Sequence, residues 1–404
     1  MKKSFRAVKY GGIGAYSATS TVSLAASLNL NLWGVSRRFY LLALTTDPAP
    51  ALTSFLSYAR SSLLGYRESA AQGDYALVAY DVDGRYRLVQ IPQNAVLYVV
   101  GNSAPRRAVG EEVLNGRCLV LKEDYTSPPG KFEKPPDEAA RLVAGGTSSA
   151  AVGAFEVEVA PENLRGLTAL AVLSDVGRVR RNNEDSGFTA SVKVSCSGST
   201  RVYWLIGVAD GAGGHEYGEL ASSEAVLEFL SVTLPGLAEG EGIPNLIREG
   251  FEAANRRVLE LIRSRGATMA STLSVAIAEA HTRTVHIGHV GDSRIYMVYR
   301  EHARRLTTDH KPPTGPRNVI TNALGLPSMW VELHAGAGGF RLEPGAILLA
   351  STDGLTELVN DNEISRVVRK LANAPWSLCR ELINLANSRG GYDNITVAVM
   401  TQLA

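Results

Sequence analysis

The sequence has little cysteine, and its histidines are confined to one part of the chain. Its 404 residues contain only three cysteines, Cys118, Cys196 and Cys379, and none forms a C-x-x-C pair. An odd number of widely spaced thiols argues against a disulfide framework or a thiolate zinc site, and it predicts a reducing, cytoplasmic setting. All seven histidines lie between His215 and His334, so the first 200 residues contain none.

The sequence also lacks an excess of charge and a long apolar run. Lys and Arg number 41 against 40 Asp and Glu, so there is no bulk electrostatic case for a nucleic-acid or membrane-surface partner. The mildly apolar start, residues 1–33, is diluted by Gly, Ser, Thr and Asn. We therefore expect neither a transmembrane helix, which needs about 18 consecutive apolar residues, nor a signal peptide. With 45% hydrophobic and 20% charged residues, the composition is that of a folded chain.

The length of the chain and a connector-like stretch near its middle predict two domains. A stretch rich in Pro and Lys, residues 127–136, is followed by the small residues 144–151, and this pattern is typical of a connector. We place the boundary near residue 145, which gives an α+β domain of residues 1–144 and a larger domain of residues 145–404. The smaller domain shows no catalytic constellation and no internal repeat, and we expect it to serve docking or regulation.

The first domain is predicted to be mixed. Asp47 and Pro48 are typical of a helix start, and apolar residues at helical spacing continue to a stop at Gly65. Asp83-Gly84 predicts a hairpin between strands at 75–82 and 85–91. Two further strands are expected at residues 95–100 and 118–121.

The second domain alternates differently. Strands are expected at residues 167–173 and 202–209, followed by helices at 218–232 and from Ile247 to Gly266. A block of strands (272–278, 285–290, 295–299 and 346–350), a helix at 376–388 and a final strand at 395–400 complete the chain. This α+β order predicts antiparallel sheets covered by helices rather than a doubly wound parallel sheet.

Carboxylates stand where the apolar strands of the second domain end. Asp210, Asp292, Asp353 and Asp393 lie next to predicted strands, and the pair Glu184-Asp185 follows another after a loop. Taken singly each is ordinary, because Asp before Gly is a common turn and Asp-Asn can form an Asx-turn. Together they would crowd at one edge of the core, where like charges repel unless cations neutralise them. Oxygen-only ligands favour Mg²⁺ or Mn²⁺ over zinc.

A centre of this kind predicts hydrolysis at phosphorus. Two hard cations about 4 Å apart lower the pKa of a bridging water and hold a phosphoryl group. An arginine would bind the non-bridging phosphate oxygens. Arg180, four residues before Glu184, is our candidate, and Arg178 and Arg181 compete with it.

Six short motifs follow one another along the second domain. They are Ser174-Asp-Val-Gly-Arg-Val-Arg-Arg-Asn-Asn-Glu-Asp185, Val208-Ala-Asp-Gly-Ala-Gly-Gly-His215, Met269-Ala-Ser-Thr-Leu273, Val290-Gly-Asp-Ser-Arg294, Ser351-Thr-Asp-Gly-Leu355 and Gly390-Gly-Tyr-Asp-Asn-Ile-Thr396. The series closely resembles the motifs of the protein phosphatase 2C (PPM) family in its prokaryotic form. Any one motif would be weak, but six in order make a strong signal. The resemblance covers roughly residues 145–404 and does not extend to residues 1–144.

The resemblance implies an α-β-β-α sandwich, two antiparallel sheets flanked by helices, with a binuclear Mg²⁺ or Mn²⁺ centre. It implies that Asp210 bridges both metals, that Glu184 and the Gly211 carbonyl serve one metal, and that Asp353 and Asp393 serve the other. Asp185 would orient metal-bound water, Arg180 would bind phosphate, and Asp292 with Asp353 would hold a weaker third metal.

Two departures from the family pattern stand out. Ala212 occupies the position where some members have a histidine proposed as general acid, and we do not assign that role to His215. Leaving-group protonation would then come from metal-bound water. The flap usually inserted before the Asn-Val-x-Thr-x-Ala-Leu-Gly motif is almost absent, because residues 309–318 join directly to residues 319–325.

The implied function is metal-dependent hydrolysis of phosphoserine and phosphothreonine on proteins, with targets of a serine/threonine kinase as partners. One alternative is a catalytically inactive binding module, against which the intact ligand set argues. The other is a flapless phosphatase of anti-anti-sigma-type partners, which the short flap favours. We expect a fragment of residues 145–404 to fold alone and to act on a small aryl phosphate. We also expect the carboxyl groups of Asp210, Asp353 and Asp393 to share one coordination sphere.

Overall fold

The structure is a computed structural model of the 404-residue chain. It describes residues 8–17, 22–32, 35–63, 75–80, 86–90, 96–100, 106–107, 112–114, 118–122, 149–159, 168–213, 217–299, 302–314 and 319–402. The predicted connector at 127–136, the turn Asp83-Gly84, the helix stop Gly65 and His215 lie outside these residues, as does part of the shortened flap.

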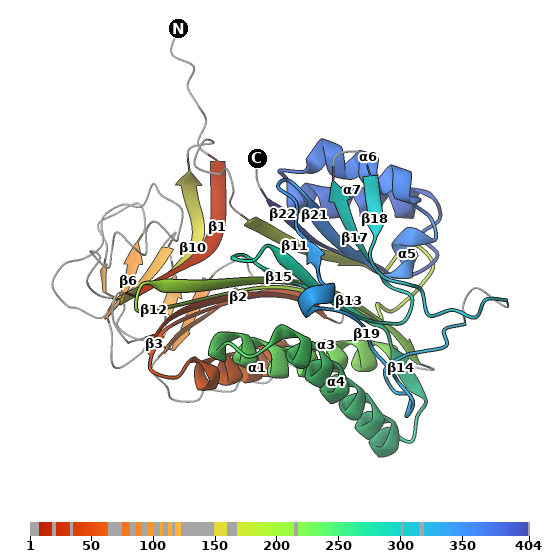
Figure 1. The fold of residues 1–404 in the computed structure, drawn as a ribbon, viewed down its shortest axis with the longest axis horizontal. Coiled ribbons are helices and arrows are strands. Elements are labelled where there is room, and N and C mark those ends of the chain that lie inside the picture. The colour runs from red at the N-terminus through yellow and green to blue at the C-terminus, as the bar shows by residue number, and fades with distance from the viewer. Residues whose placement is uncertain are drawn as a thin grey trace, which may run out of the picture.

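A long antiparallel sheet runs across the middle of the molecule (Figure 1). Its strand order is β19-β16-β15-β13-β12-β2-β3-β4-β5-β8, with β14 pairing to β13 and β20 to β16. From the second half of the chain it contains β12 (Asp185–Cys196), β13 (Ser199–Gly213), β14 (Met269–Ser271), β15 (Leu273–Glu279), β16 (Thr284–Val290), β19 (Glu332–His334) and β20 (Phe340–Arg341). From the first half it contains β2 (Val22–Leu32), β3 (Val35–Thr45), β4 (Tyr75–Tyr80), β5 (Tyr86–Gln90) and β8 (Glu112–Leu114).

Two shorter antiparallel sheets lie above the two ends of the long one (Figure 1). One has the order β11-β22-β21-β17-β18, formed by β11 (Thr168–Asp175), β17 (Arg294–Tyr299), β18 (His302–Arg305), β21 (Ile347–Ser351) and β22 (Ile395–Gln402). The other has the order β1-β10-β9-β6-β7, formed by β1 (Val8–Ser17), β6 (Val96–Val100), β7 (Arg106–Arg107), β9 (Cys118–Lys122) and β10 (Ser149–Val159).

Helices close the layers. Below the long sheet lie α1 (Pro48–Leu63), α3 (Gly218–Glu239) and α4 (Ile243–Arg265), and α5 (Asp353–Thr356), α6 (Asp361–Leu371) and α7 (Pro375–Ser388) cover the β11–β22 sheet (Figure 1). A short 3-10 turn, η2, spans Gly336–Gly338. In the second half of the chain the layers run helix, sheet, sheet, helix, so the α-β-β-α sandwich is confirmed. Buried residues between the two sheets form its core, including Val172, Ile206, Ile287 and Leu348.

The helix boundaries follow the local chemistry. The carboxylate of Asp47 accepts a hydrogen bond from the Ala49 amide at the start of α1, as the Asp-Pro pair predicted. Helix α4 ends at Gly266, whose φ of 62° is a left-handed conformation that suits glycine. Helix α3 is the one described helix long and apolar enough to cross a membrane, and 72% of its apolar window is buried inside this fold.

Several strands were not predicted, among them the long strands β1, β2, β3, β10 and β12. Strand β2 lies in the apolar start of the chain, and its alternate leucines, Leu24, Leu28 and Leu30, are fully buried. It lies between β12 and β3, with hydrogen-bonded partners on both sides, and this position in the sheet explains the apolar stretch.

The sheets do not divide at the predicted boundary. Strand β10 pairs with β1 and β9, so a cut between residues 144 and 145 would fall inside the sheet of the first half. Strand β2 pairs with β12 along its length, so residues 22–45 extend the sheet of the second half. The two halves therefore share one continuous sheet and one continuous core.

Candidate metal centre

Asp185 and Asp210 face each other across the hairpin of β12 and β13. Asp185 is 1% exposed, and its Oδ2 accepts hydrogen bonds from the hydroxyls of Thr352 (2.8 Å) and Thr396 (2.7 Å). Burial, together with the charges of Asp353 and Asp393, raises the pKa of Asp185 to about 8. The hairpin thus places two carboxylates side by side where water has little access.

The backbone around Asp210 is held from the neighbouring strands. Its amide donates to the Thr272 hydroxyl, and its carbonyl accepts from the Thr272 amide, both at 2.8 Å. Burial raises the pKa of Asp210 well above its usual range, and the charges of Asp185, Asp353, Asp292 and Asp393 raise it further. Each carboxylate that the sequence placed at a strand end, other than Glu184, therefore acts electrostatically on Asp210.

Asp353 starts the short helix α5 directly after β21. Burial, then the charge of Asp292, raises its pKa to about 7. Its Oδ1 is buried without a hydrogen-bond partner, as is Oδ1 of Asp185. Buried carboxylate oxygens without donors are expensive in a protein unless a cation neutralises them. Gly354 follows at a tight contact, because a Cβ there would lie 2.0 Å from the Asn394 carbonyl oxygen.

Glu184 and Gly211 form the other side of the site. The Glu184 amide donates to Oδ1 of Asn394 (2.8 Å), and its carbonyl accepts from the Gly211 amide (3.2 Å) and the Ser222 hydroxyl (2.6 Å). A Cβ on Gly211 would lie 2.0 Å from the Gly218 carbonyl oxygen, so only glycine fits where α3 begins. Burial, then the charge of Glu219, raises the pKa of Glu184.

Arg180 points into this acidic edge. Its Nη2 lies 2.8 Å from Oδ2 of Asp393, although half of the arginine side chain is exposed. Its charge also acts on Glu184, whose pKa it lowers. Among the three candidate arginines in the described part of the chain, Arg180 is the one with an ion pair to a site carboxylate. The structure thus places Arg180, rather than Arg178 or Arg181, beside the acidic residues.

Asp292 lies in the same cluster but already has a cationic neighbour. Lys311 Nζ is 2.8 Å from Oδ2 of Asp292, and Lys311 lies in the loop that follows β18. Attraction to Asp292 and Asp353 outweighs burial and raises the pKa of Lys311. The sequence reading did not single out Lys311, although its position two residues after Asp309 in a polar loop was visible.

A network of histidines holds that loop in place. The ring Nδ1 of His310 accepts from the amide of Gly291 (3.1 Å), and the His310 amide donates to the Gly291 carbonyl (2.8 Å). His289 Nδ1 bonds the Ser274 hydroxyl (2.7 Å) and its Nε2 bonds the Thr308 carbonyl (3.0 Å). These contacts tie the loop that carries Lys311 to the turn that carries Asp292. Sequence reasoning missed them because they join residues from separate strands and loops.

The described residues also contain one tight cluster of possible metal ligands. Among the described residues, the one group of three possible ligands whose donor atoms all lie within 4.8 Å of one another is His289, His310 and Glu332. That the carboxyl groups of Asp210, Asp353 and Asp393 share one coordination sphere stays a prediction. The two histidines use ring nitrogens in the hydrogen bonds above, which gives that group a structural role.

The donor set fits hard divalent cations. Its members are carboxylate and carbonyl oxygens, two carboxylates carry unpartnered buried oxygens, and glycines allow a close backbone approach. Raised pKa values at Asp185, Asp210 and Asp353 have the shared cause of buried like charges, which a bound cation relieves. The arrangement is therefore suited to hold metal and phosphate together.

Comparison with known proteins identifies the family of the second half of the chain. The family model described as Protein phosphatase 2C matches residues 191–382. Protein phosphatase PhpP of Streptococcus pneumoniae is 30% identical over 57% of this chain and 96% of its own length. Serine/threonine phosphatase stp of Listeria monocytogenes is 31% identical over 56% of this chain and 93% of its own. The catalytic domain of PstP, solved in complex with two manganese ions, is 25% identical over 58% of this chain and 97% of that one, with a TM-score of 0.47.

The fold and the acidic edge define a phosphoric monoester hydrolase of the sandwich type. The chain belongs to the protein phosphatase 2C family, of the bacterial type, and is a serine/threonine protein phosphatase. The sequence-based recognition is confirmed. The relatives match a little over half of the chain, so residues of the first half lie outside the matched part.

Proposed function

We propose that this chain hydrolyses phosphoserine and phosphothreonine on proteins at a centre of two Mn²⁺ or Mg²⁺ ions. The observation that carries the proposal is the set of four carboxylates around Asp210, those of Asp185, Asp353, Asp292 and Asp393, whose charges each raise the pKa of Asp210. Asp210 and the Gly211 carbonyl, with Glu184 on one side and Asp353 and Asp393 on the other, would hold the ions. When bound, such ions lower the pKa of coordinated water and make hydroxide available near neutral pH.

The protein's own groups position the substrate. Arg180 pairs with Asp393, so its guanidinium is held at the rim, where it can bind the oxygens of a phosphate by charged hydrogen bonds. Asp185 is fixed by Thr352 and Thr396, and its second oxygen is unpartnered, so it can hold a water at the site. Lys311 adds positive charge next to Asp292. No histidine stands where some family members have a proposed general acid, and Ala212 occupies the position.

The substrates would be proteins phosphorylated by a serine/threonine kinase, and a cytoplasmic location is part of the proposal. A flapless phosphatase of anti-anti-sigma-type partners remains the second candidate, because residues 309–318 are few for a flap. The Arg180–Asp393 ion pair favours the general phosphatase, since it prepares a phosphate-binding arginine. An inactive binding module is the third candidate, and the five intact site residues argue against it.

Manganese-dependent turnover of p-nitrophenyl phosphate tests the chemistry. We expect activity with Mn²⁺, none in excess EDTA, and recovery when Mn²⁺ is returned. Absence of turnover with any divalent cation would overturn the enzymatic proposal in favour of a binding module. Phosphoserine and phosphothreonine peptides, compared with a phosphorylated anti-anti-sigma protein, then separate the two remaining candidates.

A further inference from the structure

The strand order of the first half repeats that of the second. Along the chain, β1, β2 and β3 precede α1, and β11, β12 and β13 precede α3. The short sheets read β1-β10-β9-β6-β7 and β11-β22-β21-β17-β18, each with the first strand at one edge and the last strand of its half beside it. From their junction outward, the long sheet reads β2-β3-β4-β5-β8 on one side and β12-β13-β15-β16-β19 on the other. Every strand of the first half therefore has a counterpart in the same place.

The first hairpins also correspond residue by residue. Two residues connect β2 to β3 and two connect β12 to β13, and the second of each pair is glycine, Gly34 and Gly198. Aligned on these glycines, Ser27 matches Ser191, Arg37 matches Arg201 and Leu41 matches Leu205. Side chains on matching positions are buried in the same core, namely Leu24 with Phe188, Ala26 with Ala190, Leu28 with Val192 and Phe39 with Tyr203.

The pairing of β2 with β12 has the register of a twofold axis. Ser27 pairs with Ser191, which is its own counterpart in the alignment. On either side of this pair, Asn31 opposite Gly187 and Ser23 opposite Ser195 exchange matching positions. One register out of many has this property, and it is the relation found in isologous dimers. The internal contact therefore resembles that of a homodimer whose two subunits have become one chain.

Most of the metal ligands have no counterpart in the first copy, although the acidic pair Glu123-Asp124 follows β9 much as Asp353 follows β21. Thr46 stands where the second copy has Asp210. The link between β1 and β2, residues 18–21, contains no arginine or carboxylate, whereas the link between β11 and β12 carries Arg180 and Glu184. Before β10 the chain reads Gly145-Gly-Thr-Ser148, against Gly390-Gly-Tyr-Asp393 before β22. The link between β5 and β6, residues 91–95, also lacks an acid.

We propose that residues 8–159 are a second, metal-free copy of the phosphatase fold. This copy is retained as a built-in partner that positions the metal centre of the phosphatase domain in the second half of the chain. This inference rests on the proposed metal centre of the second half. The partner in question is not a separate protein but the first half of this chain, bound through β2 and α1.

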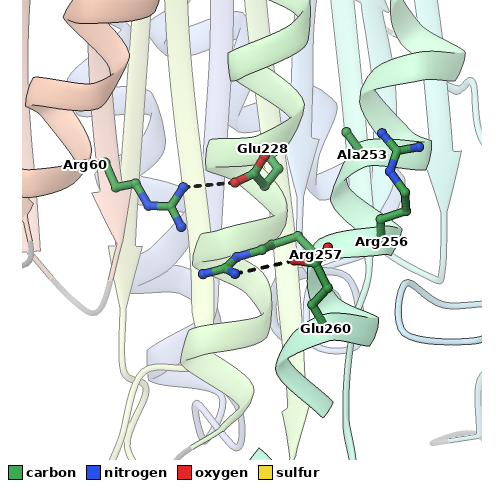
Figure 2. Close-up of a pocket in the computed structure, with 6 residues that line it drawn as sticks. All are labelled: Arg60, Glu228, Ala253, Arg256, Arg257 and Glu260. Carbon is green, nitrogen blue, oxygen red and sulfur yellow. Dashed lines mark hydrogen bonds and ion pairs between the residues drawn. The ribbon is translucent and has the colours of Figure 1, made fainter. Parts of the chain in front are cut away.

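The route from the partner copy to the site is short. Arg60 of α1 pairs with Glu224 and, at 2.9 Å, with Glu228, both on α3. Glu224 is almost fully buried and also accepts from Arg257 of α4 at 2.7 Å. A pocket of about 250 Å³ lies at this junction, lined by residues of α1, α3 and α4 (Figure 2). The three helices are thus joined by buried or half-buried charges.

The same helix α3 touches the site. The hydroxyl of Ser222 donates to the Glu184 carbonyl (2.6 Å), and a Cβ on Gly218 would lie 2.7 Å from the Glu184 carboxyl carbon. Ser222 is two residues from Glu224, within one turn of a rigid helix. A shift of α1 against α3 therefore moves the element that fixes Glu184, and Arg60 is a positioning residue for the centre.

A cross-link tests the twofold register. Ser27→Cys with Ser191→Cys is expected to form an intramolecular disulfide under mild oxidation, seen as a mobility shift that dithiothreitol reverses. The control, Ser27→Cys with Ser195→Cys, places the thiols four residues out of register and should not cross-link. Cross-linking of the control in preference to the matched pair would overturn the paired copies.

Metal binding, a readout other than activity, tests two further parts of the proposal: that the first copy holds no metal, and that Arg60 positions the metal centre. By equilibrium dialysis, Asp210→Asn should lose all tight Mn²⁺ binding. A tight site that survives in that variant would overturn the metal-free first copy. By calorimetry, Arg60→Ala should weaken Mn²⁺ binding about three- to tenfold, and Arg60→Lys should recover part of it. Arg248→Ala, on the exposed face of α4, is the matched control.

The outcomes separate the inference from the function on which it rests. If the wild-type chain binds no Mn²⁺, the proposed metal centre itself fails. If the wild type binds Mn²⁺ and Arg60→Ala binds it equally well, with an unchanged far-ultraviolet circular dichroism spectrum, the centre stands and the positioning role of the first copy fails.

Discussion

Lys311 Nζ lies 2.8 Å from Oδ2 of Asp292, at the place where the family resemblance implied a weaker third metal. An ammonium group in contact with a carboxylate supplies part of the charge that a cation would supply. The loop that carries Lys311 is anchored by His310 to the turn that carries Asp292. In this chain a side chain therefore competes with any third ion.

Removing the lysine should open that third position. We expect Lys311→Ala to bind one more Mn²⁺ per chain than the wild type at millimolar Mn²⁺, because Asp292 and Asp353 then lack their cationic neighbour. Metal content after equilibrium dialysis gives the answer. Lys370→Ala, an exposed residue of α6, should leave the content unchanged. Equal metal content in Lys311→Ala and the wild type would contradict competition at Asp292.

The carboxylates of the centre should differ in importance. Asp210→Asn should abolish turnover, because Asp210 is the carboxylate proposed to hold both ions. Asp393→Asn should cost less, because Asp393 would hold one ion and the amide oxygen of the variant can still accept the Arg180 hydrogen bond. Steady-state rates on p-nitrophenyl phosphate across a Mn²⁺ titration would measure both. The reverse order of severity would show that Asp210 is not the bridging residue.

Arg180 should act on phosphate rather than on metal. A charged hydrogen bond is worth about 1.5–3 kcal/mol, so Arg180→Ala should raise KM for a phosphopeptide about 10- to 100-fold. The apparent Mn²⁺ affinity should change little, because Asp393 keeps its carboxylate. Arg178→Ala and Arg181→Ala are the matched controls. A larger KM defect in either of them would shift the phosphate-binding role to that residue.

Acid should destabilise the fold through the histidine network. Burial lowers the pKa of His289 to about 4, so the unfolded chain takes up a proton there at a pH where the folded chain does not. The stabilisation is complete above the usual histidine pKa of 6.5 and is lost as the pH falls toward 4. One pKa unit corresponds to about 1.4 kcal/mol, so a few kcal/mol should disappear.

Urea unfolding at pH 7, 5.5 and 4.5 measures this loss. Burial would raise the pKa of Glu332, but the nearby His310 ring and hydrogen bonds from His334 and Thr308 lower it to about 2, so Glu332 should add a second loss below pH 4.5. Glu332→Gln removes that second loss and leaves the first. A free energy of unfolding that does not change between pH 7 and 4.5 would contradict the buried neutral state of His289.

Cutting the chain should expose a sheet edge. The sequence predicts that residues 145–404 fold alone, but this fragment would keep β10 without β1 and β9 and would expose the edge of β12 that pairs with β2. A fragment of residues 160–404 avoids the first problem and keeps the second. We expect it to dimerise through β12, with Ser191 opposite its own copy, because open strand edges pair readily. Light scattering after size-exclusion chromatography would decide, and a monomer would contradict the expectation.

Local signals in the sequence determined several helix ends and much of the second half. Helix ends at Gly266 and Asp47-Pro48, the strands that lead into Asp210 and Asp353, and the ordered motifs around them all depend on short-range chemistry. The sandwich, the acidic edge and the family could therefore be predicted. Strand β12 could not, because it follows a polar loop and its apolar residues are interspersed with Ser, Thr and Lys.

Only the tertiary structure decided how the halves are related. The apolar stretch at the start of the chain reads as a strand, a weak leader or a loop until β12 and β3 pair with it on both sides. The ion pair of Lys311 with Asp292 and the hydrogen bonds of His289 and His310 join residues that lie on different strands and loops. The repeat of strand order is a property of hydrogen-bond partners, and sequence identity between the two halves is too sparse to reveal it. Backbone pairing preserves a fold long after side chains have diverged, which is why the duplication appears in the sheets and not in the motifs.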